Sequence, residues 1–202
     1  MLTSPSTLTL AANLEPHVLK RWTVKEYHRM GELGILNANE HTELLAGQIL
    51  CMAAKGIPHV LALRLLDSVL DTLLADYPVF ISTQDPIQLD DWSEPEPDLA
   101  IVRGEVLDYA DRHPRPSDIE LIVEVADSTL KQDCEVKDKL YAQAGIADYW
   151  VLDLKNRQLH IFRHPTSTGY THHLILTEPN QVSPLAFPAL ILNLTDMLPP
   201  LA

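Results

Sequence analysis

The stretch IELIVEVA (residues 119–126) and its neighbour EPDLAIV (residues 96–102) decide the fold of this chain. Both are short apolar runs, and the first is rich in β-branched residues, which is typical of buried β-strands. Each run also carries a carboxylate, Asp98 in one and Glu124 in the other. Burying a carboxylate is costly unless it is paired or binds a metal. The two runs therefore predict neighbouring strands that gather negative charge at one site.

Strand alternation indicates where these acids point, because successive side chains of a strand face opposite ways. Glu124 lies opposite the wholly apolar face that the odd-numbered residues of 119–126 form, which is the expected core face. If the two strands are neighbours, Asp98 and Glu124 converge on one ion, and such oxygen ligands suit Mg²⁺ or Mn²⁺. For Asp98 alone, which follows Pro97, an ordinary strand-end position at the surface is the simpler interpretation. The pair at this spacing is harder to explain that way.

Composition limits the class of protein. The chain has 202 residues, of which 46% are hydrophobic, so it is long and apolar enough for one sizeable core. We expect an arm over residues 1–20 and a single domain over residues 21–202. The net charge is −13, from 28 acidic and 15 basic residues, which argues against broad, nonspecific adhesion to nucleic acid. A bound metal and a local basic strip can still reverse the field at a site.

Location is predicted from what the chain lacks. No apolar run is long enough to span a bilayer, and residues 8–14 lack the basic lead of a signal peptide. The two cysteines, Cys51 and Cys134, form neither a disulfide framework nor a zinc-ligand spacing. These features predict a cytoplasmic protein without membrane contact.

The periodicity of the whole chain predicts an α/β fold with a mixed central β-sheet flanked by α-helices and with additional β-hairpins. A capping box at Thr23 and Glu26 starts the first helix, and Thr129 with Gln132 is the expected capping pair of the last long one, which ends at Gly145. The expected helices are 23–33, 58–74 and 129–144; the expected strands are 42–45, 48–52, 79–81, 86–89, 97–103, 119–126, 148–153, 158–162 and 169–177. The Pro-rich tail carries one more apolar run, over 189–192.

One face of the helix over 129–144 carries Asp133, Lys137 and Tyr141, which are four residues apart. An ordinary acid–base pair on a helix surface is the simpler interpretation, and it is worth only about 0.3–0.5 kcal/mol. The sharper hypothesis is that Lys137 reaches the acids of the strands. Hydrolysis of a phosphodiester needs a cation near the attacking water or the developing charge on phosphorus.

The order of acids and lysine resembles the PD-(D/E)XK nuclease superfamily, and within it the Uma-two family of putative restriction endonucleases, which is abundant in cyanobacteria. The blocks that carry the resemblance are YHRM (27–30), GIL (34–36), ELLAGQI (43–49), GIPH (56–59), QDPI (84–87), EPEPD (94–98), EVADS (124–128), Asp133 with Lys137, YAQAGI (141–146) and YWV (149–151). In the superfamily motif the lysine follows the second acid by two residues, but here that position is Ala126. Lysines displaced to the next helix occur in the superfamily, and Lys137 matches such a position.

The resemblance implies a restriction-endonuclease-like fold and a metal site at Asp98 and Glu124. It also implies catalytic roles for Lys137 and for Glu43, which matches the early acid of the family but read alone is an ordinary hairpin residue. Gln84 matches a family position near the site whose role is open. For His59, a helix cap or a packed side chain is the more economical interpretation.

The function that follows is a Mg²⁺-dependent endonuclease, with Mn²⁺ as an alternative ion, acting on nucleic acid and most simply on DNA. A homodimer is expected, with the apolar segment 185–198 as an interface. One rival is a catalytically inactive nuclease fold that binds nucleic acid or a protein partner, which the acidic charge and the displaced lysine favour. Another is hydrolysis of a different phosphoester at the same site.

Overall fold

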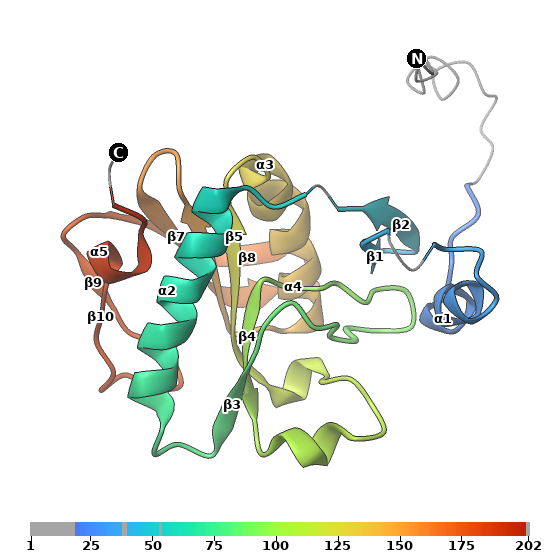
Figure 1. Ribbon diagram of the computed structural model, residues 1–202, viewed down its shortest axis with the longest axis horizontal. Helices are drawn as coiled ribbons and strands as arrows, with labels where there is room; N and C mark the ends of the chain where they lie inside the picture. The colour runs from blue at the N-terminus through green and yellow to red at the C-terminus, as the bar shows by residue number, and fades with distance from the viewer. Residues whose placement is uncertain (1–18, 38–39, 53, 201–202) are drawn as a thin grey trace.

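The computed structural model describes residues 19–37, 40–52 and 54–200 (Figure 1). Nearly all of the predicted arm, residues 1–18, therefore lies outside the described residues. The helices are α1 (Val24–Glu32), α2 (Ile57–Leu74), α3 (Leu130–Gln132), α4 (Asp138–Ala144) and α5 (Leu194–Met197). The strands are β1 (Thr42–Leu45), β2 (Gln48–Cys51), β3 (Val79–Ser82), β4 (Leu99–Arg103), β5 (Ile119–Ala126), β6 (Asp148–Asp153), β7 (Gln158–Thr166), β8 (Gly169–Thr177), β9 (Gln181–Val182) and β10 (Leu192–Asn193).

The predicted mixed sheet is confirmed. Within the described residues, six strands form it in the order β3-β4-β5-β6-β7-β8. Neighbours are antiparallel except β5 and β6, which are parallel. A parallel pair needs a crossover, and the helical segment with α3 and α4 supplies it between β5 and β6. The hairpins β1–β2 and β9–β10 stand outside this sheet.

Both faces of the sheet are buried, which differs from the expectation of a single core face. On one face α2 and α5 pack over an apolar cluster that includes Leu121, Val123 and Val125. On the other face a second cluster contains Ile122, Ala126, Tyr141 and Tyr149. Figure 1 shows α2 and α4 on opposite sides of the sheet. Glu124 therefore belongs to a strand that is enclosed on both faces.

Helix α2 anchors the first core, and one substitution tests its contribution. Leu66 is fully buried there, whereas Leu61 on the same helix is 40% exposed. Replacing Leu66 by alanine should lower the free energy of unfolding by about 2–5 kcal/mol, because it leaves a cavity as well as losing apolar burial. Leu61→Ala is the matched control and should cost less than about 1 kcal/mol. Urea unfolding measures both, and equal losses would contradict this packing.

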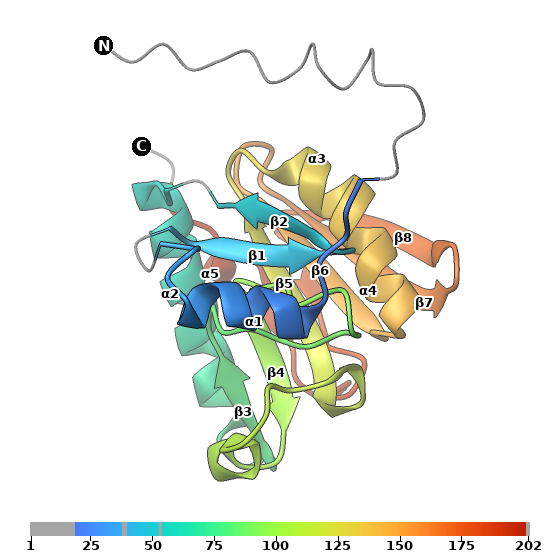
Figure 2. The ribbon, with the colours of Figure 1, turned by 90° about the vertical axis from the view of Figure 1, so that its right-hand side faces the viewer.

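The N-terminal elements form a layer of their own beside the sheet. Helix α1 begins at the predicted capping box, in which Thr23 and Glu26 bond reciprocally. The hydroxyl of Tyr27 donates to the carbonyl of Thr42, 2.8 Å away, and so fixes α1 to β1. Figure 2 shows α1 beside the β1–β2 hairpin. This layer carries Glu43 on β1.

Two local predictions are wrong. Residues 86–89 form no strand, because their amide groups bond irregular partners: Ile87 N–H donates to the Pro95 carbonyl and Gln88 N–H to that of Pro114. Thr129 takes the N-cap position of α3, but its side chain makes no capping hydrogen bond, so it forms no capping pair with Gln132. Instead the Thr129 hydroxyl donates to Asp133 Oδ2 at 2.6 Å.

The apolar segment 185–198 is divided between the core and the surface. Leu192, Leu194 and Met197 are fully buried in the first core, whereas Leu185 and Ile191 are exposed. Part of the surface expected for an interface is therefore used in folding, and the homodimer stays a prediction. None of the helices that the structure describes combines the length and apolarity that a bilayer-spanning helix needs.

Candidate active site

The pairing of β4 with β5 places Asp98 beside Glu124. Leu99 pairs with Val123, so Asp98, just before β4, lies next to Glu124 near the end of β5. The Asp98 N–H is 3.4 Å from Glu124 Oε2, and the Val125 N–H donates to Asp98 Oδ2 at 2.9 Å. Both acids are buried, at 7% and 4% exposure. The convergence expected from strand alternation is thus present in the fold.

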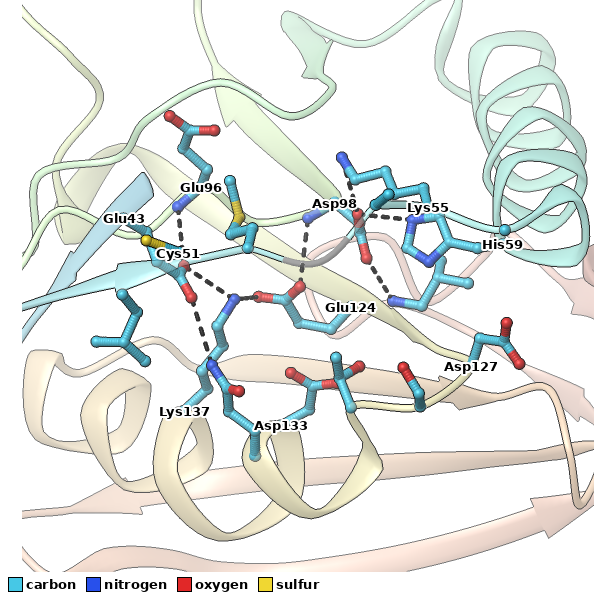
Figure 3. Close-up of a pocket in the computed structure, with 18 residues that line it drawn as sticks. Glu43, Cys51, Lys55, His59, Glu96, Asp98, Glu124, Asp127, Asp133 and Lys137 are labelled. Atoms are coloured by element: carbon cyan, nitrogen blue, oxygen red, sulfur yellow. Dashed lines mark hydrogen bonds and ion pairs between the residues drawn. The ribbon is translucent and has the colours of Figure 1, made fainter. Parts of the chain in front are cut away.

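Lys137 lies between Glu124 and the acid of the first hairpin. Its Nζ is 2.9 Å from Glu124 Oε1 and 3.1 Å from Glu43 Oε2. All three side chains are buried. The structure therefore brings together the four residues expected at the site, Glu43, Asp98, Glu124 and Lys137 (Figure 3).

A π-helical turn over Asp133–Lys137 separates α3 from α4. Single π turns within helices occur frequently at functional sites. Asp133 and Lys137 both point inward and are buried. One turn later, the Tyr141 hydroxyl donates to the same Glu124 oxygen that Lys137 contacts, at 2.9 Å. The face predicted from the spacing of these three residues is therefore turned toward Glu124.

Asp98 has three further partners from other elements. His59 Nε2 at the start of α2 lies 3.0 Å from Asp98 Oδ1, and Gln84 Nε2 donates to the same oxygen at 3.1 Å. Lys55 Nζ is 3.9 Å from it. His59 thus contacts the acid pair, which is more than the helix cap or packed side chain favoured from the sequence. Gln84 has a φ of 60°, a left-handed conformation that is uncommon in residues other than glycine.

The charges of the site do not balance. Burial raises the pKa of Glu124, and the charges of Asp133, Asp98 and Glu43 raise it further against the opposing effect of Lys137. Burial also raises the pKa of Asp133. The pKa of Lys137 lies above its usual value, because the nearby acids outweigh the burial that would lower it. Lys137 is therefore protonated, and the acids around it outnumber the bases, which is one reason why the pKa of Glu124 lies well above its usual value.

Asp98 differs from its neighbours. Its burial disfavours the charged form, but the hydrogen bond and charge of His59 act against burial, as do the bonds from Val125 and Gln84. Together they hold the pKa of Asp98 below its usual range. Asp98 is therefore ionised at neutral pH and supplies a fixed negative charge.

The acids line a cavity of about 210 Å³ between the sheet, the first hairpin and the helix after β5. The wall of this cavity also includes Lys55, Glu96, Asp127 and Cys51 (Figure 3). Ala126 takes no part in this wall, because it is buried in the second apolar cluster. The position where the superfamily motif has its lysine is thus a core position here, and a charged side chain there would be buried among apolar groups.

A search against protein families matches residues 24–195 to Uma2, described as a putative restriction endonuclease. The chain belongs to the Uma2 family. The structure also resembles the crystal structure of a putative nuclease belonging to DUF820 from Anabaena variabilis, with a TM-score of 0.65 and 15% sequence identity. That likeness covers 82% of this chain and 94% of the other, and at this identity it shows the fold alone. Among curated proteins there is no match.

The Uma2 match spans α1, the hairpin with Glu43, both acid strands and the helix with Lys137. Sequence reasoning did not find Lys55, and it gave Tyr141 only a place on the helix face. Lys55 precedes α2 in a segment without periodicity, so no pattern could place it. Tyr141 did carry a signal, because it lies four residues after Lys137 on the same face.

Proposed function

We propose that this Uma2 protein is a Mg²⁺-dependent endonuclease that hydrolyses phosphodiester bonds of nucleic acid, most simply DNA. The observation that carries the proposal is the buried pair Asp98–Glu124 with the Lys137 ammonium 2.9 Å from Glu124 Oε1, at the wall of an accessible cavity. A purely structural ion pair needs one acid for one base, whereas here several acids surround one buried lysine.

The donor set fits a divalent ion of the Mg²⁺ class. Asp98 and Glu124 would hold it, with Glu43 as a further acid, because hard cations prefer carboxylate oxygens. Among the described residues, Glu124 Oε2 has only a long contact, 3.4 Å from the Asp98 N–H, and so retains capacity for a ligand. A bound divalent ion lowers the pKa of a coordinated water and screens the charge of phosphate.

The protein's own residues would position the attacking water and stabilise the charge that develops on phosphorus. Lys137, protonated and fixed by two acids, would orient the attacking water or donate to the charge that develops on phosphorus. Tyr141 holds the Glu124 carboxylate through its hydroxyl, and His59 with Gln84 holds that of Asp98. The Lys55 side chain, which is one third exposed at the cavity wall, would contact the phosphate backbone of the substrate.

The rival proposal is an inactive nuclease fold that binds a partner, and the net charge of −13 favours it. Incubation of supercoiled plasmid with the protein and Mg²⁺ or Mn²⁺, with and without EDTA, separates the two. We expect nicked or linear DNA that appears only with the free ion. Binding of DNA without cleavage, under every ion tried, would favour the rival; cleavage that persists in EDTA would contradict the metal site. Single-stranded DNA and RNA in parallel reactions test the preference for DNA.

A further inference from the structure

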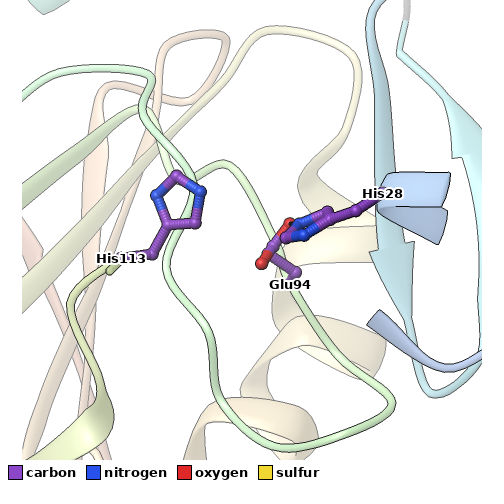
Figure 4. A group of neighbouring side chains, drawn as sticks. All are labelled: His28, Glu94 and His113. Carbon is purple, nitrogen blue, oxygen red and sulfur yellow. Dashed lines mark hydrogen bonds and ion pairs between the residues drawn. The ribbon is translucent and has the colours of Figure 1, made fainter. Parts of the chain in front are cut away.

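A second group of metal-binding side chains lies away from the acid pair. His28 on α1, Glu94 in the segment between β3 and β4, and His113 in the loop between β4 and β5 converge at one point (Figure 4). One ligand atom from each lies within 4.8 Å of the other two. None of these residues lines the cavity of the candidate active site.

Glu94 is the unusual member of this group. Its side chain is only 3% exposed, and Oε1 lies 2.6 Å from His28 Nε2. Oε2 is buried and has no hydrogen-bond partner among the described residues. An unsatisfied buried carboxylate oxygen is costly, because it loses its water without replacement. The Glu94 carboxylate faces the side on which the two rings lie, so a ligand there would satisfy it (Figure 4).

The chemistry of the group selects the ligand. Two imidazoles with one carboxylate form a mixed nitrogen and oxygen set that suits Zn²⁺, whereas Mg²⁺ prefers oxygen alone. Zinc bonds of about 2.0–2.2 Å in a tetrahedron put ligand atoms on the order of 3.3 Å apart. The ligand atoms lie within 4.8 Å of one another, and small movements of the partly exposed His28 and His113 side chains would bring them to this spacing. We propose that His28, Glu94 and His113 form a site for Zn²⁺ or a similar late transition-metal ion.

The place of these ligands indicates a structural role. Glu94 forms a β-bridge with Leu44, the residue after Glu43, through paired backbone hydrogen bonds of 2.7 and 3.2 Å. His28 is held to the same layer through its helix, since Val24 N–H bonds the Asp91 carbonyl. A metal there would join α1, the backbone beside Glu43, and the loop before β5. It would thereby hold Glu43 in position at the other site without contact to the substrate.

Calorimetric titration of the metal-free protein with Zn²⁺, together with the visible spectrum of the Co²⁺ form, tests this proposal. We expect a site of micromolar or tighter affinity that persists in Glu124→Gln, a tetrahedral Co²⁺ spectrum and a rise in melting temperature on addition of Zn²⁺. His28→Gln and His113→Gln should each weaken Zn²⁺ binding at least tenfold. His172→Gln is the matched control, because His172 pairs with His164 at a ring-centroid distance of 5.9 Å without a carboxylate in the group.

Two results would overturn the site: no Zn²⁺ binding to the wild type up to millimolar ion, or binding that His113→Gln leaves unchanged. The first would leave His28 and Glu94 as an ordinary ion pair. The test is independent of the proposed nuclease activity, because Glu124→Gln should leave Zn²⁺ binding here intact. Loss of plasmid cleavage in every sample would therefore not count against this metal site.

Discussion

Replacing Lys137 by methionine is expected to reduce cleavage by about 10²–10³-fold, the loss typical when one electrostatic donor to a transition state is removed. The same change should destabilise the fold by about 3–5 kcal/mol, because it leaves two buried carboxylates, Glu43 and Glu124, without the cation between them. Plasmid-nicking rates and urea unfolding measure the two effects.

This variant should also change how stability depends on pH. Burial raises the folded-state pKa of Glu124 from its ordinary 4.5 to about 8, and loss of the Lys137 charge raises it further. A carboxyl whose pKa is raised in the folded state binds more protons folded than unfolded, so stability falls as pH rises through that window. We expect the fall to level off near pH 8 in the wild type but to continue to higher pH in Lys137→Met, because its Glu124 keeps the proton longer. Profiles that level off at the same pH would mean that Lys137 does not compensate Glu124.

The matched control is Lys139→Met, since Lys139 is exposed two residues further along the same helical segment. It should retain the cleavage rate and unfold within about 0.5 kcal/mol of the wild type. Equal damage from the two substitutions would show that the helix, and not the position of the Lys137 charge, is responsible.

Replacing Glu124 by glutamine is the second change with a large expected effect. The amide keeps the size of the side chain but removes the negative charge and one oxygen ligand. Loss of a residue that only supports a ligand costs 10–100-fold in metal affinity or activity, so loss of the ligand itself should cost at least about 100-fold in both. Initial rates of nicking across a range of Mg²⁺ concentrations measure the loss.

Glu120→Gln provides the control on the same strand. Glu120 lies near the start of β5 and pairs with Arg103 at a partly exposed position, where an ion pair contributes at most about 1 kcal/mol. This variant should cleave like the wild type. If Glu124→Gln also cleaved at the wild-type rate, Glu124 would be a structural acid and the proposed mechanism would be wrong.

The sequence predicted the acid pair because the two strands carry their carboxylates against strong apolar periodicity. Asp98 and Glu124 required only alternation and one assumption, that β4 and β5 are neighbours, and Leu99 does pair with Val123. The place of Lys137 on one helix face with Asp133 and Tyr141 followed from their spacing of four residues. Glu43 was different, since only the family resemblance singled it out from an ordinary hairpin.

The remaining parts of the site depend on contacts between distant segments. His59 and Gln84 reach Asp98 from 39 and 14 residues away, and no local pattern encodes such contacts. The π turn at Asp133–Lys137 was also not predicted, because it is defined by a backbone bond, from the Asp138 N–H to the Asp133 carbonyl, that no side-chain pattern announces. The strand expected over 86–89 was wrong for a related reason. Its apolar residues lie in a loop that packs on the second apolar cluster of the sheet without pairing as a strand.

The central claim is that Asp98 and Glu124 hold a divalent cation beside Lys137, and calorimetric titration with Mn²⁺ tests it most directly. The titration should use a His28→Gln, His113→Gln background, so that only the acid site can respond, and should compare it with the same protein carrying Glu124→Gln. We predict a Mn²⁺ site in the background protein that weakens at least about 100-fold when Glu124 is replaced. Equal Mn²⁺ affinity in the two proteins, or no binding to either at millimolar ion, would contradict it.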